Sequence, residues 1–308
     1  MLGEITRKRT LAIASLALGA GLVAAGAAYA YLTQVPVLTG TPDQSIVAAK
    51  GNMLAWSRNS ATNSGPYDAY VRIGSGPIKR VNPVGTTGWP GGFSGDRLIF
   101  QQVSASGQSD LRFYNAVTGS YGVVPTGWNT KLWEWRPSIS GPYVLFGRIT
   151  FASDREVILL GNLTTGHVTL LAALTGKNAV AEPGQVNGNY ATWMSCPNYN
   201  VSCDVYEYNI TSGVTSKVSN TFPSGKFQTN PSVASNGTVY FFHAALACGA
   251  DVSLNKRALG ASRTMLTPFA HGLDGGDSYV DDSNGTPIVY YSRVNCAAHQ
   301  ADIYKVVD

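Results

Sequence analysis

The chain has 308 residues, of which 44% are hydrophobic and 13% are charged, and its formal net charge is +4. This length is enough to bury a large core, and the hydrophobic share excludes an intrinsically disordered chain. Three of the positive charges, Arg7, Lys8 and Arg9, lie together near the N-terminus. The rest of the chain is close to neutral and has no basic stripe, so we expect no nucleic-acid partner.

The N-terminal segment predicts export. Residues 11–32 contain no charged side chain and follow the basic cluster directly. About 20 such residues are enough to cross the apolar core of a bilayer as a helix. Ala28-Tyr29-Ala30 also fits the small-x-small pattern at which signal peptides are cleaved. Residues 1–33 are therefore predicted to form one N-terminal hydrophobic helix, either a cleaved signal peptide or a retained transmembrane anchor. Both alternatives place the later residues in an extracellular or periplasmic location.

A hairpin pattern recurs six times over residues 34–308. Each copy has a turn that ends in glycine, then a short apolar strand with an aromatic residue five positions after the glycine. The glycines recur at intervals of 44–49 residues and are Gly51, Gly95, Gly141, Gly188, Gly237 and Gly285. The aromatic residues are Trp56, Phe100, Phe146, Trp193, Phe242 and Tyr290. A repeat of about 40–50 residues built from short strands is typical of a β-propeller, so we predict an all-β, six-bladed β-propeller with these aromatics in its core.

The repeat around Gly188 predicts the content of one blade. Asn187-Gly188 between two apolar runs is a strong hairpin signal, because both turn residues adopt positive φ. The strands are expected at residues 185–186, 190–194, 204–209 and 214–218, which makes a four-stranded antiparallel blade. In the third repeat, the third strand is expected at residues 154–158.

The two ends of the propeller predict how the ring closes. The last repeat ends after its third strand, at residues 302–307, and lacks a fourth. Residues 35–39 resemble the fourth strands of other repeats and precede the first strand of the first repeat. We therefore expect this N-terminal strand to complete the last blade and to remove the free sheet edges.

Cysteine usage is consistent with export. Cys196 and Cys203 flank a loop rich in turn residues, and a disulfide there would staple that loop. Cys248 and Cys296 each lie eleven residues after the glycine of their repeat, so a second disulfide would join neighbouring blades. A zinc site is the alternative, although the CxxC spacing typical of such sites is absent. Glycosylation is predicted at the sequons of Asn162, Asn200 and Asn209.

Four acidic residues lie six to eight positions before the glycines of their repeats. They are Asp43, Glu134, Glu182 and Asp277, and they come from four different repeats. In a propeller these positions face the mouth of the central channel. Converging carboxylates there would bind a cation, or two of them would act as acid and base on a glycosidic bond; alternatively, they cap turns and face water.

Tryptophans concentrate on the linkers that enter the second and third repeats. They are Trp89, Trp128, Trp133 and Trp135. Neighbouring tryptophans on an exposed linker would stack on sugar rings or hold a partner's side chains. The alternative is that they fill the seam between blades.

The repeats resemble those of the TolB-like (WD40-like) propeller family, whose repeat runs Pro-x-Trp-Ser-Pro-Asp-Gly, then an apolar strand, then Asp-Ile-Tyr. Residues 137–141 and 231–237 are similar to the opening of that motif, and residues 204–206 and 302–304 to its close. The resemblance covers residues 35–308, but Ser-Pro-Asp-Gly is nowhere intact. It implies a binding platform rather than an enzyme, in the periplasm or outside the cell. It transfers no site residues, because the motif is structural.

We therefore expect an exported or membrane-tethered, non-enzymatic propeller that binds a protein or a cell-envelope component. No Gly-x-Ser-x-Gly elbow, His-Glu-x-x-His motif or phosphate loop is present, so we predict no catalytic residues, metal or cofactor. The alternative is a glycan-binding or glycoside-hydrolysing propeller that uses the tryptophans and the four carboxylates. A third possibility is a structural cell-surface protein.

Overall fold

The computed structural model describes residues 31–59, 66–199, 201–218, 227–244, 252–258 and 260–308. The chain divides into two compact units, Met1–Tyr31 and Leu32–Asp308. The predicted hydrophobic helix, with its alternatives of signal peptide and anchor, therefore lies almost entirely outside the described residues. Within the described ranges, no helix is long and apolar enough to cross a membrane.

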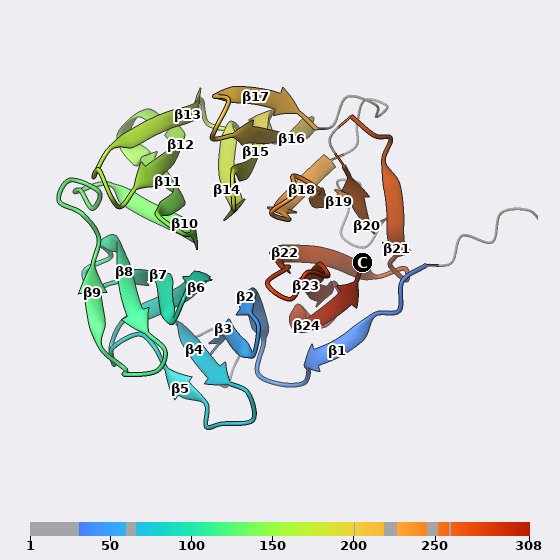
Figure 1. Cartoon of the computed structure of the whole chain (residues 1–308), viewed down its shortest axis with the longest axis horizontal. Helices are drawn as coiled ribbons and strands as arrows, with labels where there is room; N and C mark the ends of the chain where they lie inside the picture. Colours follow the sequence, from blue (N-terminus) through green and yellow to red (C-terminus); the bar gives the residue numbers. More distant parts are fainter. Residues whose placement is uncertain (1–30, 60–65, 200, 219–226, 245–251, 259) are drawn as a thin grey trace, which may run out of the picture. The chain divides into compact units, whose positions relative to one another are not determined.

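The described part of Leu32–Asp308 consists mainly of antiparallel β-sheets (Figure 1). Three sheets contain strands that follow one another in the sequence. The first has β2 (Gln44–Lys50), β3 (Met53–Asn59), β4 (Tyr67–Ile73) and β5 (Lys79–Arg80). The second has β6 (Thr87–Ser94), β7 (Arg97–Val103), β8 (Ser109–Asn115) and β9 (Tyr121–Val123). The third has β10 (Trp133–Ser140), β11 (Tyr143–Thr150), β12 (Arg155–Asn162) and β13 (Val168–Thr175), with the short 3-10 helix η1 (Phe151–Ser153) after β11.

A larger sheet follows in the sequence. Its first half has β14 (Val180–Asn187), β15 (Tyr190–Asn198), β16 (Ser202–Asn209) and β17 (Val214–Lys217). Its second half has β18 (Phe227–Val233), β19 (Val239–Ala244), β20 (Ser253–Arg257) and β21 (Thr264–Pro268). Among the described residues, one parallel bridge joins the two halves, between Cys203 of β16 and Phe227 of β18.

The last sheet joins the two ends of the propeller. It contains β22 (Leu273–Asp281), β23 (Ile288–Asn295) and β24 (Gln300–Val307), and its fourth strand is β1 (Val35–Leu38). β1 runs antiparallel to β24, with Val35 opposite Lys305 and Leu38 opposite Ile303. The prediction that an N-terminal strand completes the last sheet is confirmed.

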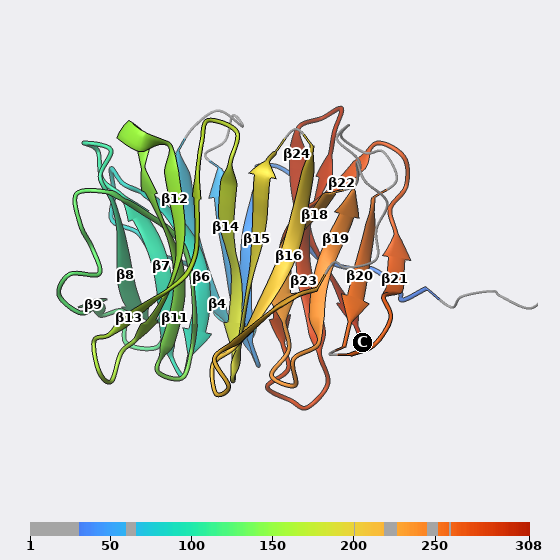
Figure 2. The same cartoon turned by 90° about the horizontal axis from the view of Figure 1, so that it is seen from above.

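The first strands of the repeats surround a central channel. β2, β6, β10, β14, β18 and β22 contact one another in this order, and β22 returns to β2 (Figure 1). In Figure 2 the strands run between two rims, with the C-terminus at the lower one. The upper rim holds the loops that enter the first strands, and the lower rim holds the glycine hairpins. This arrangement is an all-β propeller of antiparallel four-stranded blades.

The repeated residues have the roles that their pattern predicts. All six aromatics five positions after the repeat glycines are buried, and Phe100, Phe146 and Phe242 are fully so. Two of them stack on the opposite residue of the third strand: Trp56 on Tyr70, with ring centroids 6.0 Å apart, and Trp193 on Tyr206, with ring centroids 5.6 Å apart. Gly188 has φ of +56°, a conformation that residues with a β-carbon rarely adopt. Asn187 does not have the positive φ expected of it, because it pairs with Tyr190 as the last residue of β14, and the two turn residues are Gly188 and Asn189. The aromatics are therefore core residues.

Two predicted strands differ from the observed ones. The strand expected at residues 185–186 is β14, which begins at Val180, because Gly184 and Gln185 form a bulge between the paired residues Pro183 and Val186 and the strand continues on both sides of it. The strand expected at residues 154–158 is β12, which begins one residue later and runs to Asn162. Asp154 has φ of +46° and ends η1 instead.

Candidate functional site

Each first strand has a break in its pairing register near its middle, facing the channel. The breaks lie at Ser45/Val47, Pro90/Gly92, Trp135/Ser138, Pro183/Val186, Thr229/Ser232 and Gly275/Ser278. Residues at these bulges surround a cavity of about 40 Å³, the narrow centre of the channel. A β-carbon on Gly91 would lie 1.9 Å from the carbonyl oxygen of Pro137, so the backbones approach as closely as glycine allows.

Gln185 ties three of the first strands together beside this narrow centre. Its side-chain amide donates to the carbonyl of Val280 at 2.8 Å, and its Oε1 accepts from the N–H groups of Val280 and Val233 at 2.8 and 3.3 Å. These contacts join β14, β18 and β22 through one buried side chain. The bulges and Gln185 therefore hold the inner strands rigidly in place.

Towards the upper rim, Arg136 bridges carboxylates from two other strands. Its Nη1 lies 2.6 Å from Oε1 of Glu182 on β14 and also donates to Oδ1 of Asp277 on β22. β22 is not a neighbour of β10, which carries Arg136, so this ion-pair network spans the channel. Arg136 has φ of +45° at the bulge of β10, which directs its side chain out of the regular alternation of the strand.

The network carries more acid than base. Burial raises the pKa of Glu182, Arg136 opposes this rise, and the charges of Asp277 and Glu156 add to it. Burial also raises the pKa of the nearby Glu156 and of Asp274 on β22. The pKa of Arg136 is lowered by burial, but the two carboxylates outweigh this effect and raise it overall. One guanidinium thus neutralises only part of the surrounding acid.

A pocket of about 280 Å³ opens beside this network. Its polar lining includes Arg136, Glu182, Thr229, Asn230 and Asp274, and its apolar lining includes Met194, Tyr199, Phe227 and Ala244. We call this pocket the channel mouth. Met194 and Phe227 pack against the Cys196–Cys203 disulfide, and the loop that the disulfide closes carries Tyr199. One wall of the channel mouth is therefore covalently fixed.

The structure brings two of the four predicted carboxylates together. Glu182 and Asp277 share Arg136, a residue that the sequence analysis did not identify. Glu134 is buried and bonds to Arg148 Nε and Thr130 Oγ1 at 2.8 and 2.7 Å.

Asp43 lies apart from that pair. It accepts hydrogen bonds from Tyr67 Oη at 2.7 Å and from the N–H of Ala301 at 2.5 Å. The Glu134 and Asp43 carboxylates thus hold neighbouring loops and strands.

The four predicted tryptophans are dispersed. Trp128 is buried, stacks on Phe146 and donates from Nε1 to the carbonyl of Gly166 at 3.0 Å. Trp89 lies against Tyr67, with ring centroids 6.1 Å apart.

The other two tryptophans lie on β10. The guanidinium of Arg136 lies 5.7 Å from the ring of Trp135, so this tryptophan borders the ion-pair network. Trp133 contacts Phe151 edge-on at 5.9 Å and lines a separate pocket of about 310 Å³.

The structure describes three of the four cysteines and two of the three predicted glycosylation sites. The Cys196–Cys203 disulfide is present as predicted, and Cys296 is disulfide-bonded as well. Cys248 and Asn200 lie outside the described residues. Asn162 and Asn209 accept hydrogen bonds from N–H groups of their own turns, at 2.9 Å from Thr164 and 3.0 Å from Ser212. Among the described residues, no group of three or more His, Cys, Asp or Glu side chains could hold a metal ion.

Solved structures similar to this chain include TolB from Acinetobacter baumannii. It is 15% identical with a TM-score of 0.53, and the match covers 83% of this chain and 64% of TolB. A protein named as TolB from Agrobacterium tumefaciens is 12% identical with a TM-score of 0.55, and the match covers 87% of this chain and 91% of that one.

A third similar structure is the β-propeller domain of the Trilobed protease from Pyrococcus furiosus. It is 12% identical with a TM-score of 0.51, and the match covers 86% of this chain and 95% of that domain. No family model matches the sequence, and no curated protein matches it. Identities this low show the fold alone. The chain is a β-propeller whose fold is similar to that of the TolB structures.

Proposed function

We propose that Leu32–Asp308 is a six-bladed β-propeller that acts as a non-enzymatic binding platform for a protein partner. The six-blade count rests on treating the two halves of the large sheet as separate blades. One parallel bridge joins these halves, whereas the strands within each half pair along their length.

The partner segment that best fits the channel mouth is basic. Four carboxyl groups, those of Glu156, Glu182, Asp274 and Asp277, lie in or near the ion-pair network of a single guanidinium. A lysine or arginine side chain entering the pocket would neutralise this excess, with its aliphatic stem against Met194 and Phe227. The excess of partly buried acid beside a preformed pocket of about 280 Å³ is the observation that carries this proposal.

Binding fits this arrangement better than glycoside hydrolysis does. A glycosidase places the scissile bond between two carboxyl groups, one as acid and one as base or nucleophile. Here the same nitrogen of Arg136 contacts both Glu182 and Asp277, so a guanidinium occupies the space between them.

Glycan binding is the second candidate. One observation favours it: Phe151, 66% exposed, lies edge-on against Trp133 at a pocket of about 310 Å³. Aromatic faces at such a pocket would stack on a sugar ring.

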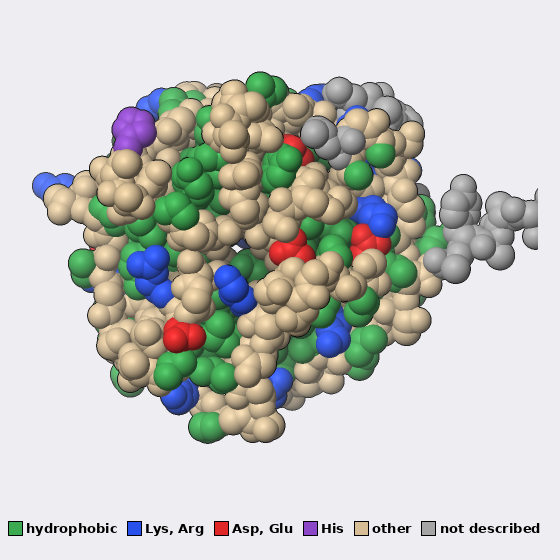
Figure 3. All heavy atoms as spheres, viewed as in Figure 1, with side chains coloured by type: hydrophobic (Ala, Val, Ile, Leu, Met, Phe, Trp, Pro, Cys, Tyr) green, Lys and Arg blue, Asp and Glu red, His purple; other side chains and the backbone are tan. Residues whose placement is uncertain are grey.

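We place the propeller outside the cytoplasm, in the periplasm or at the cell exterior. The disulfide between Cys196 and Cys203 supports this location, because such bonds persist in oxidising compartments. The charge-free segment after Arg7, Lys8 and Arg9 would provide the export signal or a membrane tether. On the face shown in Figure 3, Lys and Arg side chains are scattered and form no continuous basic patch, which fits a protein partner better than a nucleic acid.

Short synthetic peptides with a central Lys, Ala or Glu provide the test. Binding of each peptide to the full chain is measured by fluorescence anisotropy at low and high salt. We expect the Lys peptide to bind at least about tenfold more tightly than the Glu peptide, with a preference that weakens at high salt.

Two variants locate the binding. Glu182→Gln should remove most of the preference for Lys, whereas Asp96→Asn, which removes an exposed charge at the opposite rim, should leave it unchanged. Equal affinity for Lys and Glu peptides would refute the basic-segment proposal. A glycan array run on the same protein, with Trp133→Ala as the comparison, decides the second candidate.

A further inference from the structure

Glu207 occupies a core position of the repeat. It pairs across the sheet with Thr192, the residue four positions after the repeat glycine Gly188. The corresponding residues in the other sheets are all buried, and four of the five are apolar: Val71, Phe113, Leu160, Val306 and the polar Asn255. A carboxylate at this position therefore departs from the packing rule of the propeller.

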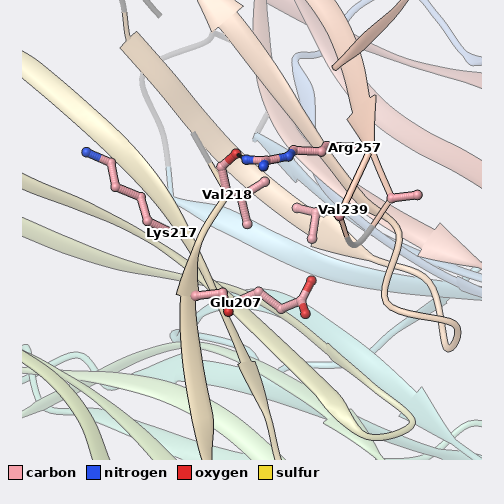
Figure 4. Close-up of a pocket in the computed structure, with 8 residues that line it drawn as sticks. Glu207, Lys217, Val218, Val239 and Arg257 are labelled. Atoms are coloured by element: carbon pink, nitrogen blue, oxygen red, sulfur yellow. Dashed lines mark hydrogen bonds between the residues drawn. The ribbon is translucent and has the colours of Figure 1, made fainter. Parts of the chain in front are cut away.

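Glu207 faces a cavity rather than a partner. It is 5% exposed and lines a pocket of about 380 Å³, together with Ser216, Val218, Val239 and Arg257 (Figure 4). We call this pocket the seam pocket, because it lies between β16–β17 and β20, where the two halves of the large sheet meet. Within the described part of the chain, no hydrogen bond or ion pair reaches the Glu207 carboxylate. Burial raises its pKa to about 7, and Arg257 opposes this rise.

Arg257 lies at the other end of the same pocket. Its Nε donates to the carbonyl of Ala261 at 3.0 Å, and its Nη1 donates to the carbonyl of Val218. A guanidinium has five N–H donors, so donors remain after these two bonds. In Figure 4 the guanidinium and the Glu207 carboxylate lie on opposite sides of Val218 and Val239. Across the pocket, the apolar wall of Val218 and Val239 therefore lies between the carboxylate of Glu207 and the guanidinium of Arg257.

The nearby lysine does not neutralise Glu207. Lys217 also lines the pocket, but its Nζ pairs with Asp204 at 2.7 Å. Figure 4 shows its side chain directed away from Glu207. A buried carboxylate without a partner costs folding free energy, and a ligand that supplies a hydrogen-bond donor would recover that cost.

We propose that the seam pocket binds a small amino-carboxylic acid, with its ammonium group on Glu207 and its carboxylate on Arg257. The carbon chain between these ends would lie against Val218 and Val239, which are both buried. This site lies towards the lower rim, and it is independent of the basic segment proposed for the channel mouth.

Calorimetry with three probes tests the assignment on the full chain. The probes are 4-aminobutanoate, butanoate and butylamine, which carry both charged ends, the acid alone or the amine alone. We expect 4-aminobutanoate to bind at least about tenfold more tightly than either single-ended probe, because each end forms a charge-assisted hydrogen bond. Equal binding of the three probes, or no binding of 4-aminobutanoate up to about 10 mM, overturns the proposal.

Variants assign the two ends. Glu207→Gln should weaken 4-aminobutanoate about tenfold or more and leave butanoate unchanged, whereas Arg257→Gln should weaken both. Lys79→Gln is the matched control, since it removes an exposed charge on β5, away from the seam pocket, and it should leave every affinity unchanged. Thermal melting of each variant establishes that it is folded. An affinity unaffected by Glu207→Gln in a folded protein refutes the assignment.

Discussion

The channel mouth and the seam pocket both contain acidic side chains that are largely shielded from solvent, but the acid is paired in the first and unpaired in the second. At the channel mouth Glu182 and Asp277 share a guanidinium across the channel. In the seam pocket Glu207 has Arg257 in the same cavity, yet no ion pair joins them in the described part of the chain. The first arrangement stabilises the fold through paired charges, and the second leaves a charge whose partner would come from outside. Substitutions at the two places should therefore change stability in opposite directions.

The largest expected effect is at the channel mouth. Arg136→Asn leaves Glu182 and Asp277 without their cation and should lower the free energy of unfolding by about 3 kcal/mol. Asparagine suits this position because it tolerates positive φ, and Asn230 has φ of +50° at the corresponding bulge of β18. Chemical denaturation of the variant measures the change.

A triple variant that also removes the two carboxylates distinguishes the electrostatic contribution of Arg136 to stability from its packing contribution. Adding Glu182→Gln and Asp277→Asn to Arg136→Asn removes the unpaired acid and should restore most of the lost stability. If the triple variant is as unstable as the single one, the ion pairs are not what Arg136 contributes.

The disulfide provides a second way to distinguish the two regions. Replacing Cys196 and Cys203 by serine opens a short loop, whose closure contributes about 2–3 kcal/mol. The loop carries Tyr199 of the channel mouth, so the affinity for the Lys peptide should fall as well. The affinity of the seam pocket for 4-aminobutanoate serves as the internal control, and an equal loss there would show that the disulfide does not act locally.

The seam pocket should show the smallest effect and the opposite sign. The raised pKa of Glu207, about 7 against an ordinary 4.5, means that the folded protein holds this proton more tightly than the unfolded chain does. The free energy of unfolding should therefore fall as the pH rises from about 4.5 to about 7. Glu207→Gln removes this pH-dependent loss of stability. The variant should have a free energy of unfolding roughly 2 kcal/mol higher than the unsubstituted protein at pH 8, and the difference should be smaller at pH 5. Denaturation curves at the two pH values test this, and destabilisation at pH 8 would contradict it.

The repeating parts of the fold were predictable because each position recurs six times. The hairpin glycines and the aromatics five positions later share one packing role, so their burial follows from the pattern. The closing strand was predictable because the last repeat lacks a fourth strand.

The channel mouth was predictable only in part. Glu182 and Asp277 were recognised as facing the channel, but their partner Arg136 lies at a bulge, where regular alternation no longer indicates which way a side chain points. Asp43 and Glu134 have similar spacing, yet Tyr67 and Arg148 bind them locally. Spacing alone does not distinguish these cases.

Glu207 was missed although a signal was present. Val205 and Glu207 alternate on one face of β16, and both are buried. Counting three residues from the aspartate near the start of each third strand (Asp204, Asp68 and Asp110) places Glu207 with Val71 and Phe113, and the observed pairing gives the same alignment. The departure from a mostly apolar position was therefore readable from the sequence alone.

The pairing of β1 with β24 has a mechanical consequence. Tension applied to the chain ahead of Gln34 would reach the propeller through β1, which has three paired positions with β24. Three hydrogen bonds lie ahead of that strand and would bear the load first. Gln34 donates to Thr267 and accepts from Tyr291, and the N–H of Leu32 donates to the carbonyl of Leu266. The ring would thus yield at one defined seam under a pull from its N-terminus, by peeling a single short strand while the inner strands around Gln185 stay assembled.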